Sequence, residues 1–171
     1  MMMNLLLVAF ILAMVYWWAL QGLFSSMLHL MVVILAGSLA FAVWETLVMT
    51  TLIHQMPAMA WGVGLLAPFV LFVIALRVIL EKLAPRNVFF FDIANKVGGG
   101  LFGLFSGILV AGFTLIGIGF MPLPASVLGY QPYVVIDGRV APNPESSLWL
   151  SVDRWAGGFY AGLSAGPFAP I

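Results

Sequence analysis

Residues 1–44, MMMNLLLVAFILAMVYWWALQGLFSSMLHLMVVILAGSLAFAVW, contain no charged side chain. Over all 171 residues, 64% of the side chains are hydrophobic and 7% are charged. A soluble domain carries about 25% charged residues, so this composition requires lipid as the main solvent. The opening run lacks both a basic segment and a small-residue cleavage site, and its apolar stretch is too long for a signal peptide. It predicts a retained membrane helix.

Three further apolar stretches reach the length that a membrane helix needs, about 20 residues for a hydrocarbon layer of about 30 Å. The four predicted spans cover residues 3–20, 27–49, 61–80 and 97–121. None of them alternates with a period of two, which disfavours a membrane β-barrel. The short connections predict antiparallel neighbours. We therefore expect an all-α, polytopic membrane protein with a four-helix transmembrane domain at residues 1–121.

Basic residues concentrate in the third predicted connection, residues 81–96. This stretch holds Lys82, Arg86 and Lys96, whereas the first two connections hold no lysine or arginine. Cytoplasmic loops of membrane proteins are enriched in lysine and arginine. We therefore predict that residues 81–96 are cytoplasmic and that both termini are extracytoplasmic.

Two ionisable residues lie within the predicted spans. Arg77 is one turn from the end of its span and four residues before Glu81, so it is expected to reach the headgroups and pair with that carboxylate. Glu45 lies near the outer end of the second span. It is interpreted as an interfacial carboxylate, with an ion or proton site inside the bundle as the alternative.

The fourth span carries small residues at four-residue spacing, namely Gly99, Gly103, Gly107 and Ala111. They share one helix face, where small residues let two helix backbones approach closely in lipid. Glycine inside a helix otherwise costs about 1 kcal/mol relative to alanine. The ladder therefore predicts a packing seam, or glycine zipper, against another helix of this chain or against a second chain.

The pair Asn95 and Lys96, followed by glycines every four residues, resembles the start of the fourth span in the colicin V production protein (CvpA-like) family. Gly22 resembles a glycine of the turn after that family's first span. Asn4 and Trp18 depart from the pattern, because the family has an acidic residue and a glycine there. The resemblance implies a four-span bacterial inner-membrane protein linked to colicin V production or export.

Residues 122–171 hold seven of the ten prolines and are predicted to form an extracytoplasmic tail. Residues 134–136 are compatible with a short strand. A helix is predicted at about residues 144–164, with Asn143 as its N-cap. This helix is amphipathic, and we expect its apolar face to dock on a partner protein or on the top of its own bundle, or to lie at the membrane interface. The residues expected to dock are Trp149, Val152, Trp155, Phe159 and Tyr160.

No pattern of catalytic residues is visible. The chain has no cysteine, and its serines, histidines and carboxylates show no triad order or paired spacing. His29 and His54 fall near opposite membrane faces, so they are not expected to hold a haem together. His29 is interpreted as a hydrogen-bonding side chain, with pigment magnesium ligation as the alternative. We predict no catalytic, cofactor-binding or metal-binding residues and, with zero net charge, no nucleic-acid binding.

These patterns favour a non-enzymatic, CvpA-like membrane protein that acts in helix packing, assembly or recruitment. Its expected partners are the lipid bilayer and other membrane subunits or further copies of itself. Two alternatives stay open at this point. One is an accessory structural subunit of a larger energy-transducing or secretion complex, and the other is a small transporter or channel working through Glu45 and Arg77.

Overall fold

The computed structural model describes residues 2–83, 91–121, 133–136, 139–142, 148 and 150–165. Its long helices are α1 (Met2–Gln21), α2 (Leu23–Leu47), α4 (Ala60–Leu83) and α5 (Asp92–Gly119). Helix α2 continues through a π-helical turn, η1 (Val48–Leu52), into α3 (Ile53–Gln55). Each of the four resulting helices is long and apolar enough to cross a membrane, which identifies a multi-pass membrane protein.

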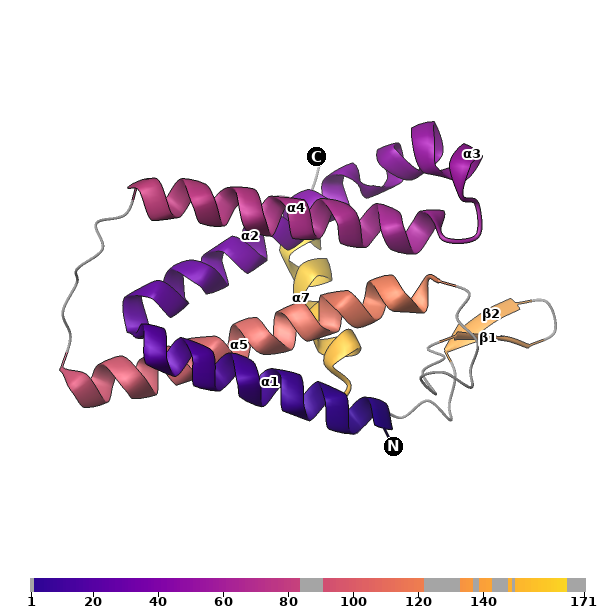
Figure 1. Cartoon of the computed structure of the whole chain (residues 1–171). Coiled ribbons are helices and arrows are strands. Elements are labelled where there is room, and N and C mark those ends of the chain that lie inside the picture. Colours follow the sequence, from indigo (N-terminus) through magenta and orange to yellow (C-terminus); the bar gives the residue numbers. More distant parts are fainter. Residues whose placement is uncertain are drawn as a thin grey trace.

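The four helices run up and down beside one another (Figure 1). One end of the bundle, here the Gly119 end, holds the start of α1, the turn between α3 and α4, and the end of α5. The opposite Asp92 end holds the α1–α2 turn, the end of α4 and the start of α5. Helix α5 is central, because it contacts α1, α2, α4 and α7 (Val152–Ala165).

The tail contributes a two-stranded antiparallel hairpin besides α7. Strand β1 (Tyr133–Ile136) pairs with β2 (Arg139–Pro142), with Ile136 opposite Arg139. Strand β1 includes residues 134–136, for which the sequence is compatible with a strand. The described part of the chain is helical apart from this hairpin and short connections.

The first connection is shorter than predicted. Gly22 alone separates α1 from α2, and its φ of +92° lies in the left-handed region that glycine tolerates. Asn95 of α5 accepts a hydrogen bond from the Leu23 amide at 2.7 Å, which satisfies one of the free amides at the start of α2. A Cβ at residue 22 would lie 2.6 Å from Asn95 Oδ1. One glycine and one asparagine thus replace the predicted loop.

The second connection is also shorter, because the helix continues beyond residue 49 to Gln55. Within this extension, the Thr50 hydroxyl donates to the Thr46 carbonyl at 2.7 Å. The helix ends at Gln55, because Met56 precedes Pro57 and a residue before proline is disfavoured in the helical conformation. At the Asp92 end, α5 begins five residues earlier than the predicted span. The predicted cytoplasmic connection therefore includes helical turns at both of its ends.

The glycine ladder packs against α1 of the same chain. A Cβ at Gly99 would lie 2.6 Å from the Trp18 carbonyl oxygen, and one at Gly103 would lie 2.7 Å from Trp18 Cβ. Gly107 and Ala111 continue the same contact along α1. The expected packing seam therefore lies against α1, a helix of this chain.

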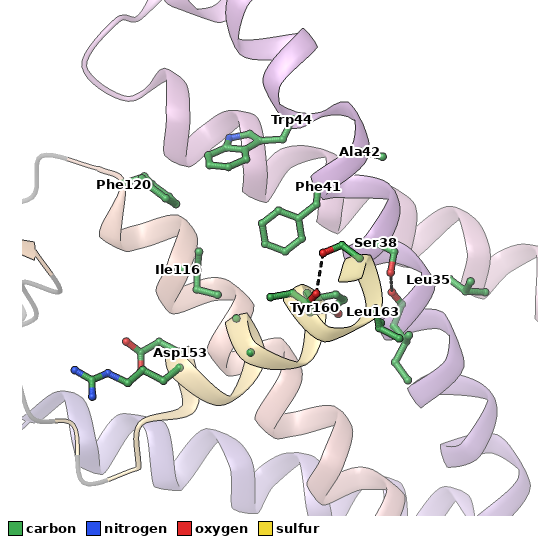
Figure 2. Close-up of a pocket in the computed structure, with 16 residues that line it drawn as sticks. Leu35, Ser38, Phe41, Ala42, Trp44, Ile116, Phe120, Asp153, Tyr160 and Leu163 are labelled. Atoms are coloured by element: carbon green, nitrogen blue, oxygen red, sulfur yellow. Dashed lines mark hydrogen bonds between the residues drawn. The ribbon is translucent and has the colours of Figure 1, made fainter. Parts of the chain in front are cut away.

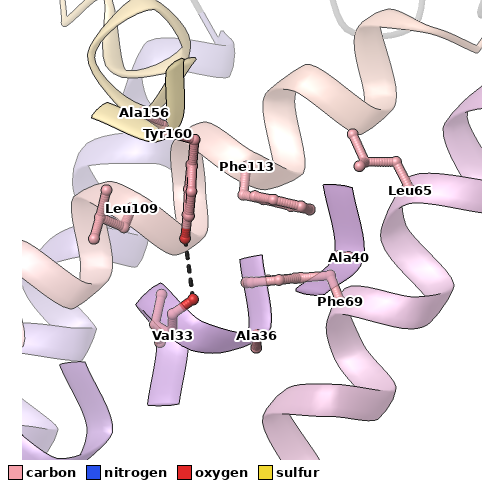
Figure 3. Packing of buried hydrophobic residues seen from close by; sticks show 9 residues of the cluster. All are labelled: Val33, Ala36, Ala40, Leu65, Phe69, Leu109, Phe113, Ala156 and Tyr160. Atoms are coloured by element: carbon pink, nitrogen blue, oxygen red, sulfur yellow. Dashed lines mark hydrogen bonds between the residues drawn. The ribbon is translucent and has the colours of Figure 1, made fainter. Parts of the chain in front are cut away.

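The largest buried cluster joins α2, α4, α5 and α7 (Figure 3). Phe113 of α5 is fully buried, stacks on Phe69 of α4 at 4.1 Å between ring centroids, and meets Tyr160 of α7 edge-on at 5.6 Å. The cluster consists of Val33, Ala36, Ala40, Leu65, Phe69, Leu109, Phe113, Ala156 and Tyr160. Helix α7 is therefore part of the bundle core.

Candidate binding site around helix α7

Helix α7 is seated in a groove between α5 and α2. Its buried residues, Val152, Ala156 and Tyr160, follow one another at four-residue spacing. Glycines open the groove on both sides. A Cβ at Gly112 of α5 would collide with the Val152 carbonyl oxygen and lie 2.5 Å from Ala156 Cβ, and one at Gly37 of α2 would collide with the Tyr160 hydroxyl. These two glycines allow the close approach of α7.

The hydrogen bond of Tyr160 shows at which level along the bundle α7 lies. The Tyr160 hydroxyl donates to the Val33 carbonyl at 3.0 Å, and Val33 is near the middle of α2. A buried hydroxyl surrounded by lipid and apolar side chains needs such an internal acceptor. Helix α7 crosses the bundle level with the middle of α2 (Figure 1). This corrects the prediction of a helix beyond the ends of the spans.

The helix also begins later than predicted, at Val152 rather than near residue 144. Leu150 and Ser151 are not helical, and the predicted N-cap Asn143 lies outside the described residues, as does Trp149. The amphipathic pattern predicted a broad apolar face. It did not reveal which stripe of that face would fit the groove.

The structure divides the predicted docking residues between two faces. Val152 and Tyr160 are buried against the chain's own bundle, so a partner cannot reach them. Trp155 and Phe159 point away from the groove, with exposed fractions of 75% and 38%. The two glycines of the groove face the Val152–Ala156–Tyr160 stripe, so Trp155 and Phe159 lie outside it. Trp155 and Phe159 are called the aromatic ridge below.

A cavity of about 1050 Å³ lies beside α7, bounded by α2 and the end of α5. Figure 2 shows Trp44 and Phe120 at one end of it and Tyr160 and Leu163 at the other. Most of its lining is apolar, and its polar residues are Ser38, Asp153, Arg154 and Ser164. Sequence analysis missed this cavity because its walls come from three segments far apart in the chain.

The Asp92 end contains a polar cluster. The His29 ring stacks on Trp18 at 4.2 Å, and the Arg77 guanidinium lies 5.0 Å from the centroid of the Trp18 ring, within cation–π distance. Arg77 also bonds Glu81 Oε1 at 2.7 Å and Ser25 Oγ at 3.3 Å, which confirms the predicted Arg77–Glu81 pair. This cluster ties α1, α2 and α4 together.

The hydrogen bond expected for His29 is not found among the described residues. Both ring nitrogens of His29 are buried and have no hydrogen-bond partner among the described residues. The same holds for Nε1 of Trp18. Stacking therefore replaces hydrogen bonding as the main contact of this imidazole with the described chain. His54 lies in α3 at the Gly119 end, so the two histidines are separated as predicted.

The remaining predicted charge, Glu45, is exposed on the surface of α2. It lies toward the Gly119 end, whereas Arg77 lies toward the Asp92 end, so the two residues do not share a site. Within the described ranges, no three histidine or carboxylate side chains come close enough together to hold a metal ion.

Comparisons of the chain with protein-family models, curated proteins and solved structures find no match. The candidate sites are therefore those defined by its own geometry, namely the aromatic ridge, the cavity beside α7 and the cluster at the Asp92 end.

Proposed function

We propose that this chain is a non-enzymatic, CvpA-like protein of the bacterial inner membrane that assembles with other membrane proteins. The observation that carries the proposal is the aromatic ridge. Val152 and Tyr160 hold α7 in its groove, while Trp155 and Phe159 on the outer face remain exposed. Binding hot spots are enriched in large aromatic residues, and they work best on rigid elements. The ridge has both properties.

The distribution of charge supports an orientation. Arg77, Lys82 and Lys96 all lie toward the Asp92 end. By the positive-inside bias, we assign this end to the cytoplasm and the Gly119 end to the extracytoplasmic side. The end of α5 would then lie on the extracytoplasmic side, and α7 would enter the hydrocarbon layer from that side.

The contacts at the Asp92 end support the family resemblance. Gly22 and Asn95, two residues on which the resemblance depends, touch each other at the α1–α2 turn. Gly99 and Gly103 then bring α5 against α1 directly beyond that turn. The residues of the pattern therefore lie together in the structure.

Photo-crosslinking tests the proposal. A photoreactive residue is placed at position 155 and, as a matched control, at Trp17, which is an equally large side chain with 59% exposure on α1. We expect protein adducts from position 155 and mainly lipid adducts from position 17. The Trp155→Ala/Phe159→Ala double variant should lose the same complex during purification in mild detergent. Lipid adducts alone from position 155 would contradict the proposal.

The identity of the adduct separates the remaining alternatives. A stoichiometric foreign subunit would favour an accessory role in a larger complex, and an adduct with a second copy would favour self-association. Ion flux in proteoliposomes that is lost in Glu45→Gln would favour the transporter instead. The exposure of Glu45 on α2 argues against that outcome.

A further inference from the structure

The cavity beside α7 is kept open by two adjacent glycines. Gly157 and Gly158 both line it. A Cβ at Gly158 would have no atom within 4 Å, and one at Gly157 would meet only Ile116 Cδ1, at an ordinary 3.8 Å. Close packing therefore does not require glycine here, in contrast to Gly112, where a Cβ would collide with the backbone of α7. Larger side chains at these two positions would extend into the cavity.

The cavity has the length of one lipid leaflet. The residues of α2 that line it extend from Ile34 to Trp44, which is about 15 Å of helix at 1.5 Å per residue. Half of a hydrocarbon layer of about 30 Å is also about 15 Å. Since Tyr160 lies level with the middle of α2 and Trp44 lies toward the Gly119 end, the cavity occupies the half of the bundle nearer that end.

The lining combines a long apolar wall with one carboxylate, Asp153, and one cationic group, Arg154. Ile34, Leu35, Phe41 and Ile116 offer a surface for a hydrocarbon chain. Arg154 also lines the cavity and is exposed. A guanidinium can bind a phosphate through two parallel hydrogen bonds. The long arginine side chain lets this group lie nearer the membrane surface than the backbone of α7.

We propose that this cavity binds one phospholipid from the leaflet at the Gly119 end. The phosphate pairs with Arg154, and an acyl chain lies along the α2 wall of the cavity, beside Gly157 and Gly158. The volume of about 1050 Å³ slightly exceeds the range of about 300–1,000 Å³ that small-molecule sites occupy. The site depends on residence in the membrane and does not depend on the protein partner proposed for the aromatic ridge.

The chain offers a matched pair of variants for the test. Gly158→Leu would project into the cavity, whereas Gly162→Leu would project from the same helix away from it, because a Cβ at Gly162 also has no atom within 4 Å and this residue does not line the cavity. Both changes replace glycine by a better helix former, so neither is expected to unfold α7. Thermal unfolding followed by tryptophan fluorescence checks this directly.

The readout is native mass spectrometry of protein extracted from membranes in mild detergent. We expect one retained phospholipid per chain for the wild type and for Gly162→Leu, and at least about a tenfold lower retained fraction for Gly158→Leu and for Arg154→Gln, which loses a charge-assisted hydrogen bond. Absence of lipid from the wild type, or equal retention in the two leucine variants, would overturn the proposal. A protein adduct from a photoreactive residue at Ala161, in place of a lipid adduct, would also overturn it.

Discussion

The contact between α5 and α1 can be tested with two neighbouring glycines. A Cβ at Gly99 would lie 2.6 Å from the Trp18 carbonyl oxygen and 3.1 Å from the carbonyl carbon of Gly22, both of which belong to the backbone. One at Gly100 would lie 3.7 Å from side-chain atoms of Ala19 and Val15, an ordinary contact. Gly99→Ala should therefore force the helices apart, and Gly100→Ala should be accommodated.

The two variants should differ in their free energy of unfolding because they share the gain in helix propensity but not the cost of overpacking. Each gains about 1 kcal/mol of helix propensity on replacing glycine by alanine. Overpacking adds a cost of about 1–3 kcal/mol, and only Gly99→Ala incurs it. The free energy of unfolding of Gly99→Ala should thus be about 1–3 kcal/mol lower than that of Gly100→Ala, which itself should be at least as stable as the wild type.

The assay is unfolding by SDS titration in mixed micelles, followed by circular dichroism and tryptophan fluorescence. Comparison of Gly99→Ala with Gly100→Ala removes effects of the detergent and of helix propensity, because both changes lie in the same turn of α5. Coincident unfolding midpoints for the two variants would refute the packing of Gly99 against the backbone of α1.

Three further predictions concern single contacts. Tyr160→Phe removes the hydrogen bond to the Val33 carbonyl and should lower the free energy of unfolding by about 0.5–1.5 kcal/mol; an unchanged SDS midpoint would contradict this. Asn95→Ala removes the acceptor for the Leu23 amide, so hydrogen exchange of that amide should accelerate by about fivefold or more. Gly112→Leu places a side chain where the Val152 backbone lies; α7 should leave its groove, and tryptic cleavage at Arg154 should accelerate by about tenfold or more.

The four spans and the glycine seam of the bundle could be predicted from local patterns in the sequence. Apolar length predicts the four spans, and four-residue spacing predicts the seam at Gly99 and Gly103, because both depend on one helix at a time. The connections were harder to predict. In the one-residue turn at Gly22, the Leu23 amide donates to Asn95, which is 72 residues away along the chain. No local sequence pattern indicates that contact.

The position of α7 could not be predicted for a similar reason. Its pattern of Trp155, Phe159 and Tyr160 indicates a helix that needs a surface, but the surface is created by Gly37 and Gly112 on two other helices. Glycines in membrane helices are common, so neither one marks a groove by itself. The cavity beside α7 follows from the same arrangement, and so does the polar cluster in which Trp18 lies between His29 and Arg77.

The location of α7 alongside the spans is the claim on which both proposals depend, and spin-label accessibility tests it most directly. The chain has no cysteine, so single cysteines can be labelled at Gly162 on α7, at Ile74 in the middle of α4 and at Gln55 at the end of α3. Position 162 should match position 74, with high accessibility to oxygen and low accessibility to a water-soluble nickel complex. A label at position 162 that is as accessible to nickel as the label at position 55 would contradict the account.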